Sequence, residues 1–234
     1  MKRPRVMNQT VQGPGDDAIG IVLLAAGAST RMGTPKQLLK LQGISLIRRA
    51  AEQALASPCR PVVVVLGANA DRIAPELDGL PTETVVNREW SKGISSSIHC
   101  GLRRLLTISP EIKAVLFLLA DQPNVTGTSL TRLAEAHLQS RSELVAARYS
   151  GQVGTPALFS RSYFDELLRI DGPRGAKAML RLYADRVFPV DSPEAAVDLD
   201  TPGDLADFLP SESISESALV KGPPSSLDHQ FGSL

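Results

Sequence analysis

The chain is poor in cysteine, balanced in charge and free of long hydrophobic runs. Only Cys59 and Cys100 occur among 234 residues, so neither a disulfide framework nor a cysteine-based metal cluster is expected. Its 25 basic and 25 acidic residues give a formal net charge of zero, without the footprint of a nucleic-acid-binding or membrane-surface protein. No apolar run approaches the roughly 18 residues of a membrane span. We therefore expect a cytoplasmic protein with neither nucleic acid nor membrane as a partner.

Signatures of several common enzyme classes are also missing. The sequence contains neither the GxxxxGK(S/T) of a Walker loop nor the GxGxxG of a dinucleotide-binding fold. It shows no Ser/His/Asp set, no HExxH and no CxxC, so a hydrolytic triad and structural zinc are not expected. If the protein is an enzyme, its catalytic residues must therefore belong to motifs other than these.

Composition divides the chain into a folded unit and two tails. Residues 1–17 begin basic but lack the apolar core of a signal peptide, which favours a disordered leader. Residues 210–234 are rich in Ser, Pro, Gly and acidic side chains, which is typical of a flexible tail. The expected folded unit is one domain over residues 18–209, long enough to bury a good core.

Apolar, β-branched runs alternate with helical patterns along this domain. Strands are predicted at 19–24, 61–66, 84–86 and 114–119, and helices at 45–56, 71–77, 95–106 and 129–138. Strands that are apolar on both faces and separated by helices predict a parallel sheet covered on both sides. We therefore expect an α/β fold, a three-layer α/β/α sandwich around a mostly parallel, Rossmann-like sheet. Beyond 143 the pattern loosens, with strands predicted at 143–149, 156–159 and 186–190 and helices at 162–168 and 175–183.

The most informative stretch covers residues 21–36, IVLLAAGASTRMGTPK. An apolar strand breaks into Ala-Ala-Gly at 25–27, and a loop of small polar residues then presents Arg31 and Lys36. Small residues let backbone N–H groups approach phosphate oxygens closely, and two long cations neutralise phosphate charge. A glycine-rich loop after a strand also occurs without a ligand, but these added cations favour a triphosphate-binding loop.

Two acidic loops are expected at the same edge of the sheet. Asp121 follows a predicted buried strand, and Asp198 and Asp200 are two positions apart, so both face one side of an extended segment. A carboxylate from each loop suits a Mg²⁺ ion that bridges phosphate oxygens. Each loop also has a simpler interpretation: Asp121 caps a turn, and Asp200 or Thr201 is the N-cap of the following helix.

A further segment, NREWSKGISSSIHCGL at 87–102, leads from a glycine and three serines into a helix. Free N–H groups and hydroxyls around Gly93 and Ser97 suit a ribose or a base, although an ordinary serine cap predicts the same pattern. Trp90, the only tryptophan, either covers a pocket or simply packs. His99 lies next to an apolar helix position, and a structural role is expected for it.

These residues, in this order, resemble the MobA-like nucleotidyltransferases, and most closely the molybdenum cofactor cytidylyltransferases of the MocA type. The resemblance covers about residues 19–208 and rests on LLAAGASTRMGTPKQLL, LADQP, GTPALF, GPRGAKAML and VDLDTPGDL. It implies a fold of the nucleotide-diphospho-sugar transferase type. The first loop reads LAAG rather than the LAGG typical of the guanylyltransferase branch, which looks more like a user of pyrimidine nucleotides such as CTP.

The resemblance also implies roles for individual residues. Backbone groups of Leu24, Ala25, Ala26 and Gly27 would contact the nucleotide, and the side chains of Arg31 and Lys36 would hold its triphosphate. Gly93 and Ser97, at the start of the 95–106 helix, would lie near the base and the ribose. Asp121 would bind Mg²⁺ together with Asp200, or alternatively with Asp198. Lys36, Arg31 and Asp121 would carry the catalysis.

The implied reaction joins CTP to the molybdopterin form of the molybdenum cofactor. The terminal phosphate of the cofactor would attack the α-phosphorus of CTP and release pyrophosphate, and this anionic nucleophile needs no general base. The sequence has Thr155 where the family often has His, and Pro173 where it often has an acid, so a different phosphorylated acceptor stays open. A third interpretation is an accessory protein that delivers the cofactor to a recipient molybdoenzyme.

Overall fold

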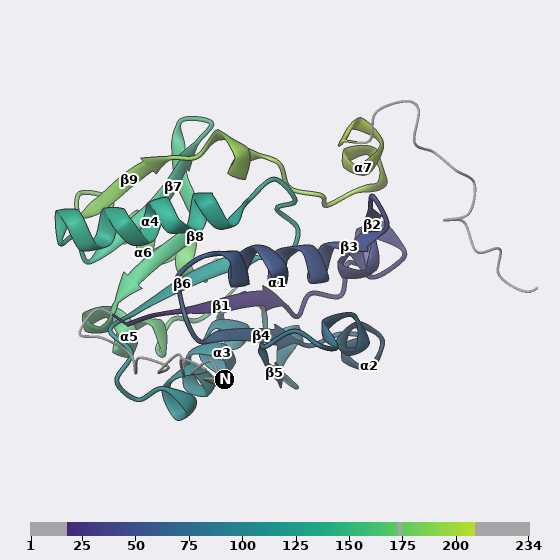
Figure 1. The fold of residues 1–234 in the computed structure, drawn as a ribbon, viewed down its shortest axis with the longest axis horizontal. Coiled ribbons are helices and arrows are strands. Elements are labelled where there is room, and N and C mark those ends of the chain that lie inside the picture. The colour runs from purple at the N-terminus through teal and green to yellow at the C-terminus, as the bar shows by residue number, and fades with distance from the viewer. Residues whose placement is uncertain (1–17, 173–174, 209–234) are drawn as a thin grey trace, which may run out of the picture.

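A seven-stranded mixed sheet forms the centre of the protein (Figure 1). The computed structural model describes residues 18–172 and 175–208. The strand order is β5-β4-β1-β6-β8-β7-β9, and all strands are parallel except β8, which is antiparallel to both neighbours. The strands are β1 (Ile19–Ala25), β4 (Val62–Leu66), β5 (Glu83–Val86), β6 (Ala114–Leu119), β7 (Leu144–Tyr149), β8 (Gln152–Ser160) and β9 (Val187–Asp191).

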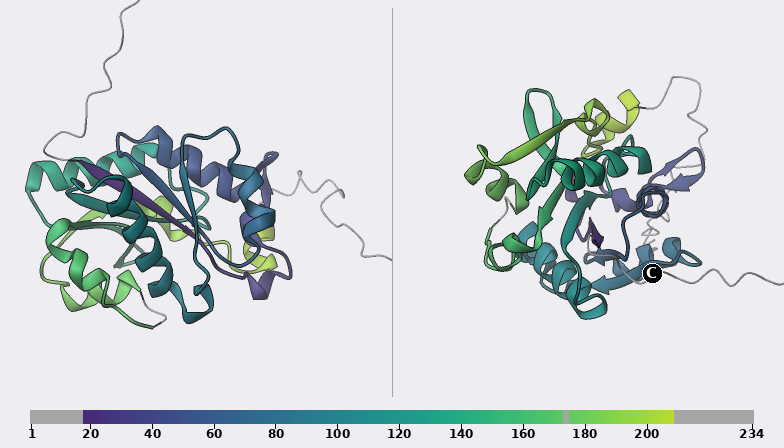
Figure 2. Two further views of the ribbon diagram at one scale, coloured as in Figure 1. Left: turned by 90° about the horizontal axis from the view of Figure 1, so that it is seen from below. Right: turned by 60° about the vertical axis from the view of Figure 1, so that its left-hand side comes forward.

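Helices cover both faces of this sheet, as Figures 1 and 2 show. One face packs against α1 (Leu46–Ala56) and α4 (Gly127–Ser140), which share one apolar cluster with it. The opposite face packs against α3 (Ile94–Ile108), α5 (Phe164–Leu167) and α6 (Ala176–Leu182), which belong to a second cluster. The predicted three-layer α/β/α sandwich with a mostly parallel sheet is therefore confirmed.

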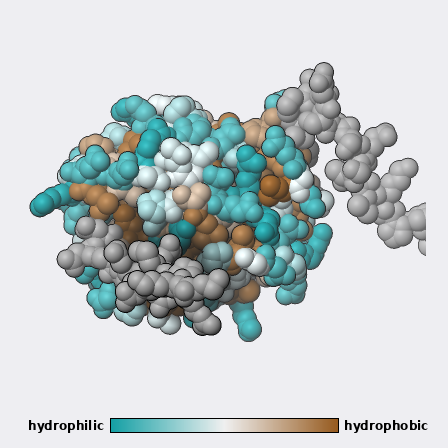
Figure 3. All heavy atoms as spheres, in the orientation of Figure 1, coloured by the Kyte–Doolittle hydropathy of each residue, from teal (hydrophilic) through white to brown (hydrophobic). Residues whose placement is uncertain are grey.

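The central strands explain why two cores form. In β1, Ile21 and Leu23 enter the cluster under α1 and α4, while Val22 and Leu24 enter the cluster over α3. Successive side chains of a strand point to opposite faces, so a strand covered on both sides must be apolar throughout. On the face of the molecule that Figure 3 shows, hydrophobic residues are interspersed among hydrophilic ones.

Gly101 sets how closely α3 approaches the sheet. A Cβ atom built at this position would lie 2.7 Å from Val65 Cγ2 and closer still to Val22 Cγ1, both in central strands. We expect Gly101→Ala to lower the free energy of unfolding by about 1–3 kcal/mol because the core has no room for the methyl group. Urea denaturation measures this, with Gly203→Ala as the control.

Gly203 is also helical, in α7 (Pro202–Phe208), but a Cβ atom built there would lie 3.6 Å from Thr201 Oγ1, which is an ordinary van der Waals distance. Alanine there should leave stability unchanged or raise it by about 0.5–1 kcal/mol. Equal stability of the Gly101→Ala protein and wild type would contradict the close packing of α3.

The structure adds features that the pattern did not predict. The strand expected at 156–159 runs from Gln152 and forms a hairpin with β7 through Ser150 and Gly151, both at positive φ. Strands β2 (Lys40–Leu41) and β3 (Ile44–Ser45) form a second hairpin. The helix expected at 71–77 is α2 (Ala70–Ile73) followed by a 3-10 turn (Ala74–Leu77).

The leader and the tail proposed from composition lie outside the described residues. Within the described part of the chain, no helix is long and apolar enough to cross a membrane.

Candidate nucleotide site

The loop after β1 begins at the carboxyl edge of the sheet, where ligands bind in open α/β folds. Leu24, Ala25 and Ala26 are buried, and Gly27 is exposed at the point where the chain leaves the sheet. Further along, Ser29 adopts a left-handed conformation with φ 55°. The loop thus leaves the core at a glycine and then turns back toward Lys36.

Gln37 holds this loop in shape. Its side chain is 2% exposed, and its Nε2 donates to the carbonyl oxygens of Ala25 at 2.9 Å and Gly27 at 2.8 Å. Its Oε1 accepts from Ser29 Oγ at 3.2 Å, and Ser29 Oγ accepts from the backbone N–H of Lys36 at 3.0 Å. Sequence reasoning missed Gln37, because a polar residue between Lys36 and two leucines gives no sign that it is buried.

Replacing Gln37 with methionine should loosen this loop. The variant keeps the length of the side chain but leaves two carbonyl oxygens without their donor, at a cost of about 1–3 kcal/mol in stability. We expect about a tenfold rise in the KM for nucleotide, with a smaller change in kcat. Steady-state kinetics and a thermal melt measure both effects. Gln139→Met, at an exposed position in α4, is the control, and an unchanged KM in Gln37→Met would contradict this role.

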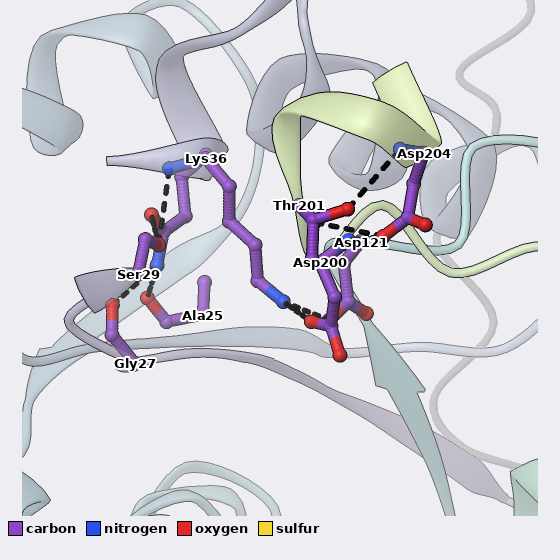
Figure 4. Close-up of polar contacts among 9 residues, drawn as sticks. Ala25, Gly27, Ser29, Lys36, Asp121, Asp200, Thr201 and Asp204 are labelled. Carbon is purple, nitrogen blue, oxygen red and sulfur yellow. Dashed lines mark hydrogen bonds and ion pairs between the residues drawn. The ribbon is translucent and has the colours of Figure 1, made fainter. Parts of the chain in front are cut away.

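Lys36 meets two carboxylates from distant parts of the chain (Figure 4). Its Nζ forms an ion pair with Asp121, which follows β6, and a second one at 2.7 Å with Asp200, which precedes α7. The Lys36 and Asp121 side chains are 18% and 16% exposed, whereas Asp200 is 39% exposed. The three residues that sequence analysis placed in one site therefore do come together, with the lysine between the two acids.

The charges of this cluster act on one another. Burial by itself lowers the pKa of Lys36, but Asp121 and Asp200 outweigh it, so the pKa is raised and the ammonium group stays protonated. Loss of water around its carboxyl group, followed by the charges of Asp121 and Asp200, raises the pKa of Asp198 to about 6. The negative charges of Asp121 and Asp200 therefore act on Asp198, and a positive charge is favoured near these carboxylates.

Backbone contacts hold the two acidic loops together. The N–H of Leu199 donates to the carbonyl oxygen of Asp121 at 3.0 Å. Thr201 Oγ1 accepts from the N–H of Asp204 at 3.2 Å, and the Asp204 carboxylate accepts from the N–H groups of Thr201 and Asp200 at 2.7 and 2.9 Å. The helix cap is therefore made by Thr201 and Asp204, so the side chain of Asp200 reaches Lys36 instead of capping.

The fit of a divalent cation can be tested on these residues. Asp121 Oδ1 is buried and accepts no hydrogen bond from any residue that the structure describes, so one hard oxygen ligand is available beside Asp200. Within residues 18–172 and 175–208, no three His, Cys, Asp or Glu side chains group as a dedicated metal site needs. Mg²⁺ usually takes one or two carboxylates and completes its shell with water and substrate phosphates, and the two acidic loops match that pattern.

The serines at the start of α3 are used differently from the expectation of free hydroxyls. Ser95 Oγ donates to the carbonyl oxygen of Gly172 at 2.7 Å, and Ser97 Oγ accepts from Asn87 Nδ2 at 3.1 Å. Gly93, with φ 103°, precedes the helix without a side-chain cap. These hydroxyls tie α3 to its neighbours, and a contact of Gly93 or Ser97 with nucleotide stays a prediction.

Two predicted features cannot be placed. The side chain of Arg31 and the whole of residues 173–174, which include Pro173, lie outside what the structure describes. The triphosphate role of Arg31 therefore stays a prediction.

Comparison with known proteins identifies the family. Residues 21–187 match the model of the MobA-like NTP transferase domain. The chain belongs to this family. It is also 36% identical over 170 residues to a protein of Paenarthrobacter nicotinovorans named nicotine blue oxidoreductase, in a match that covers 68% of this chain and 80% of that one. The match to the family model covers well over half of the chain and therefore shows the family.

Solved structures agree with the fold. Rv0371c of Mycobacterium tuberculosis H37Rv, in a complex with manganese, is 27% identical with a TM-score of 0.67, covering 82% of this chain and 98% of that one. The 4-diphosphocytidyl-2C-methyl-D-erythritol synthase of Anaerococcus prevotii is 15% identical with a TM-score of 0.66, covering 82% and 94%. This second likeness shows the fold alone, and the expected fold of the nucleotide-diphospho-sugar transferase type is confirmed.

Proposed function

We propose that this MobA-like NTP transferase moves CMP from CTP to the terminal phosphate of the molybdopterin form of the molybdenum cofactor and releases pyrophosphate. The observation that carries the proposal is the meeting of Lys36 with Asp121 and Asp200 beside the loop after β1. At the carboxyl edge of the sheet, a lysine can neutralise phosphate charge and two carboxylates can hold a divalent cation, and these are the groups needed to bind a triphosphate.

The chain's own residues supply positioning and charge. Backbone groups of the loop after β1, kept in shape by Gln37, face the phosphates. The ammonium of Lys36 turns from the carboxylates to the phosphates and neutralises the charge that develops on the α-phosphate and the leaving pyrophosphate. The phosphate of the acceptor is already an anion, so none of these residues has to remove a proton from it.

A divalent cation fits this site through Asp121 and Asp200. When bound, it would act as a Lewis acid that draws negative charge from the phosphate oxygens. A relative crystallised with manganese supports a divalent cation in the family, and Mg²⁺ is the ion we propose for this chain.

The proposed nucleotide and acceptor are inferred from residues in the loops around the site. The LAAG reading at 24–27 supports CTP, whereas Thr155 and Pro173 depart from the usual family pattern in the half that would hold the acceptor. Transfer of label from α-³²P CTP to a panel of acceptors tests this part. We expect label on molybdopterin-bound molybdenum and none on sugar or polyol phosphates. Labelling of one of these alone would keep the transferase and replace its acceptor.

A redox reaction is the second candidate, because one relative is named nicotine blue oxidoreductase. Oxidation of a reduced nicotinamide cofactor, followed in parallel with pyrophosphate release, separates the two classes. We expect pyrophosphate release and no oxidation above the protein-free blank. Oxidation that continues without a nucleoside triphosphate and a divalent cation would favour the redox reaction.

A further inference from the structure

A second hollow lies at the edge of the sheet, apart from the Lys36 cluster. Strand β5 is the outermost strand on this side and pairs only with β4; α3 runs along it (Figure 1). Between β5 and α3 is a cavity of about 430 Å³, within the range of about 300–1,000 Å³ typical of small-molecule sites. We call it the β5–α3 pocket.

Basic side chains dominate the walls of this pocket. Arg88 follows β5, and Arg103 and Arg104 project from α3. Arg104 is neutralised by an ion pair with Glu83. Within the described residues, the guanidinium groups of Arg88 and Arg103 form neither a hydrogen bond nor an ion pair, so the pocket has two such groups available to an anion.

The acidic residue in the wall does not cancel this charge. Glu89 also lines the pocket, but its carboxylate forms an ion pair with Lys92. Its hydrogen bond to Lys92, the charge of Lys92 and, more weakly, the charge of Arg103 lower the pKa of Glu89. The pocket therefore keeps an excess of positive charge from Arg88 and Arg103.

The remaining polar groups of the pocket restrict which class of ligand it can bind. His99 lines the pocket, and its Nε2 is buried without a hydrogen-bond partner among the described residues, which costs free energy unless a partner is supplied. Asn87 is saturated, because its Nδ2 donates to Ser96 and Ser97 and its Oδ1 accepts from Glu89 N. The side chains of Arg88 and Arg103 are therefore the groups left for a ligand beside His99, and planar guanidinium groups match the geometry of phosphate oxygens.

We propose that the β5–α3 pocket is a second anion site, which binds the phosphate group of a small phosphorylated metabolite through Arg88 and Arg103, with His99 beside it. The site is separate from the proposed transfer chemistry and does not depend on it. The two are linked through Asn87, which lines the pocket and holds Ser97 in the first turns of α3.

Histidine NMR with inorganic phosphate as the probe tests the proposal. The chain has three histidines, His99, His137 and His229, so the ring signals are few, and His99→Gln assigns the relevant one. In full-length protein at constant pH and ionic strength, phosphate should shift the His99 signal saturably. The double variant Arg88→Gln/Arg103→Gln should weaken this binding about tenfold or more. Arg88→Lys/Arg103→Lys keeps the charge and should bind in between.

Lys36→Met separates this pocket from the nucleotide site. That variant should keep the phosphate shift of His99 at wild-type affinity. Loss of the shift in Lys36→Met would mean that phosphate acts from the nucleotide site and would overturn the proposal. An equal shift in chloride, no saturable shift, or an unchanged affinity in the arginine-to-glutamine double variant would overturn it as well.

Discussion

Replacing Lys36 with methionine is expected to lower the rate of pyrophosphate release by about 10²–10³-fold. Methionine keeps the length of the side chain but removes the positive charge that two carboxylates hold at the phosphate loop. Among the described residues, no other positively charged group contacts the Asp121 side chain. Initial rates at saturating nucleotide measure the loss.

Lys40→Met is the matched control for this variant. Lys40 lies four residues further on, is exposed, and should keep wild-type turnover when replaced. A thermal melt of each protein in Mg²⁺ checks that both are folded, because Lys36→Met leaves the charges of Asp121, Asp198 and Asp200 without their lysine. Turnover of folded Lys36→Met within threefold of wild type would contradict the role of this residue.

Asp121→Asn is the second variant with a large expected effect, again about 10²–10³-fold on turnover. Asparagine has the shape of aspartate, so the turn after β6 and its contact with Leu199 should survive. The variant loses the charge that pairs with Lys36 and the anionic oxygen, Oδ1, that has no hydrogen-bond partner in the described part of the chain. The site would then hold both the lysine and a divalent cation less firmly.

The readout for Asp121→Asn is turnover as a function of Mg²⁺ concentration. We expect a higher Mg²⁺ requirement as well as a lower maximum, which loss of fold alone would not produce. Asp78→Asn, at an exposed position outside the site, should match wild type. An unchanged Mg²⁺ profile in Asp121→Asn would rule out Asp121 as a ligand.

The sequence predicts the central strands and the chemistry-bearing loops well, for a physical reason. Strands buried on both faces must be apolar at every position, as in PVVVVL at 61–66, so their signal is strong. Loops at the carboxyl ends of such strands are known to meet at one edge, which is why Asp121 could be placed with the loop after β1.

Contacts between distant parts of the chain could not be predicted in the same way. Lys36 was expected on phosphates, yet its partners in the protein lie 85 and 164 positions away at Asp121 and Asp200. The antiparallel direction of β8 depends on a tight turn at Ser150 and Gly151. Gln37 is buried because it donates hydrogen bonds to inward-pointing carbonyl oxygens, and the pattern of apolar residues in the sequence does not reveal where those carbonyl oxygens point.

The most direct test of the account is pyrophosphate release with Mg²⁺, molybdenum-loaded molybdopterin and each of CTP, GTP, ATP and UTP in turn. Wild-type protein and Lys36→Met are compared side by side. We predict that the wild-type protein releases pyrophosphate with CTP alone and that Lys36→Met loses nearly all of this activity. Release with none of the four nucleotides, or equal release by both proteins, would contradict the account.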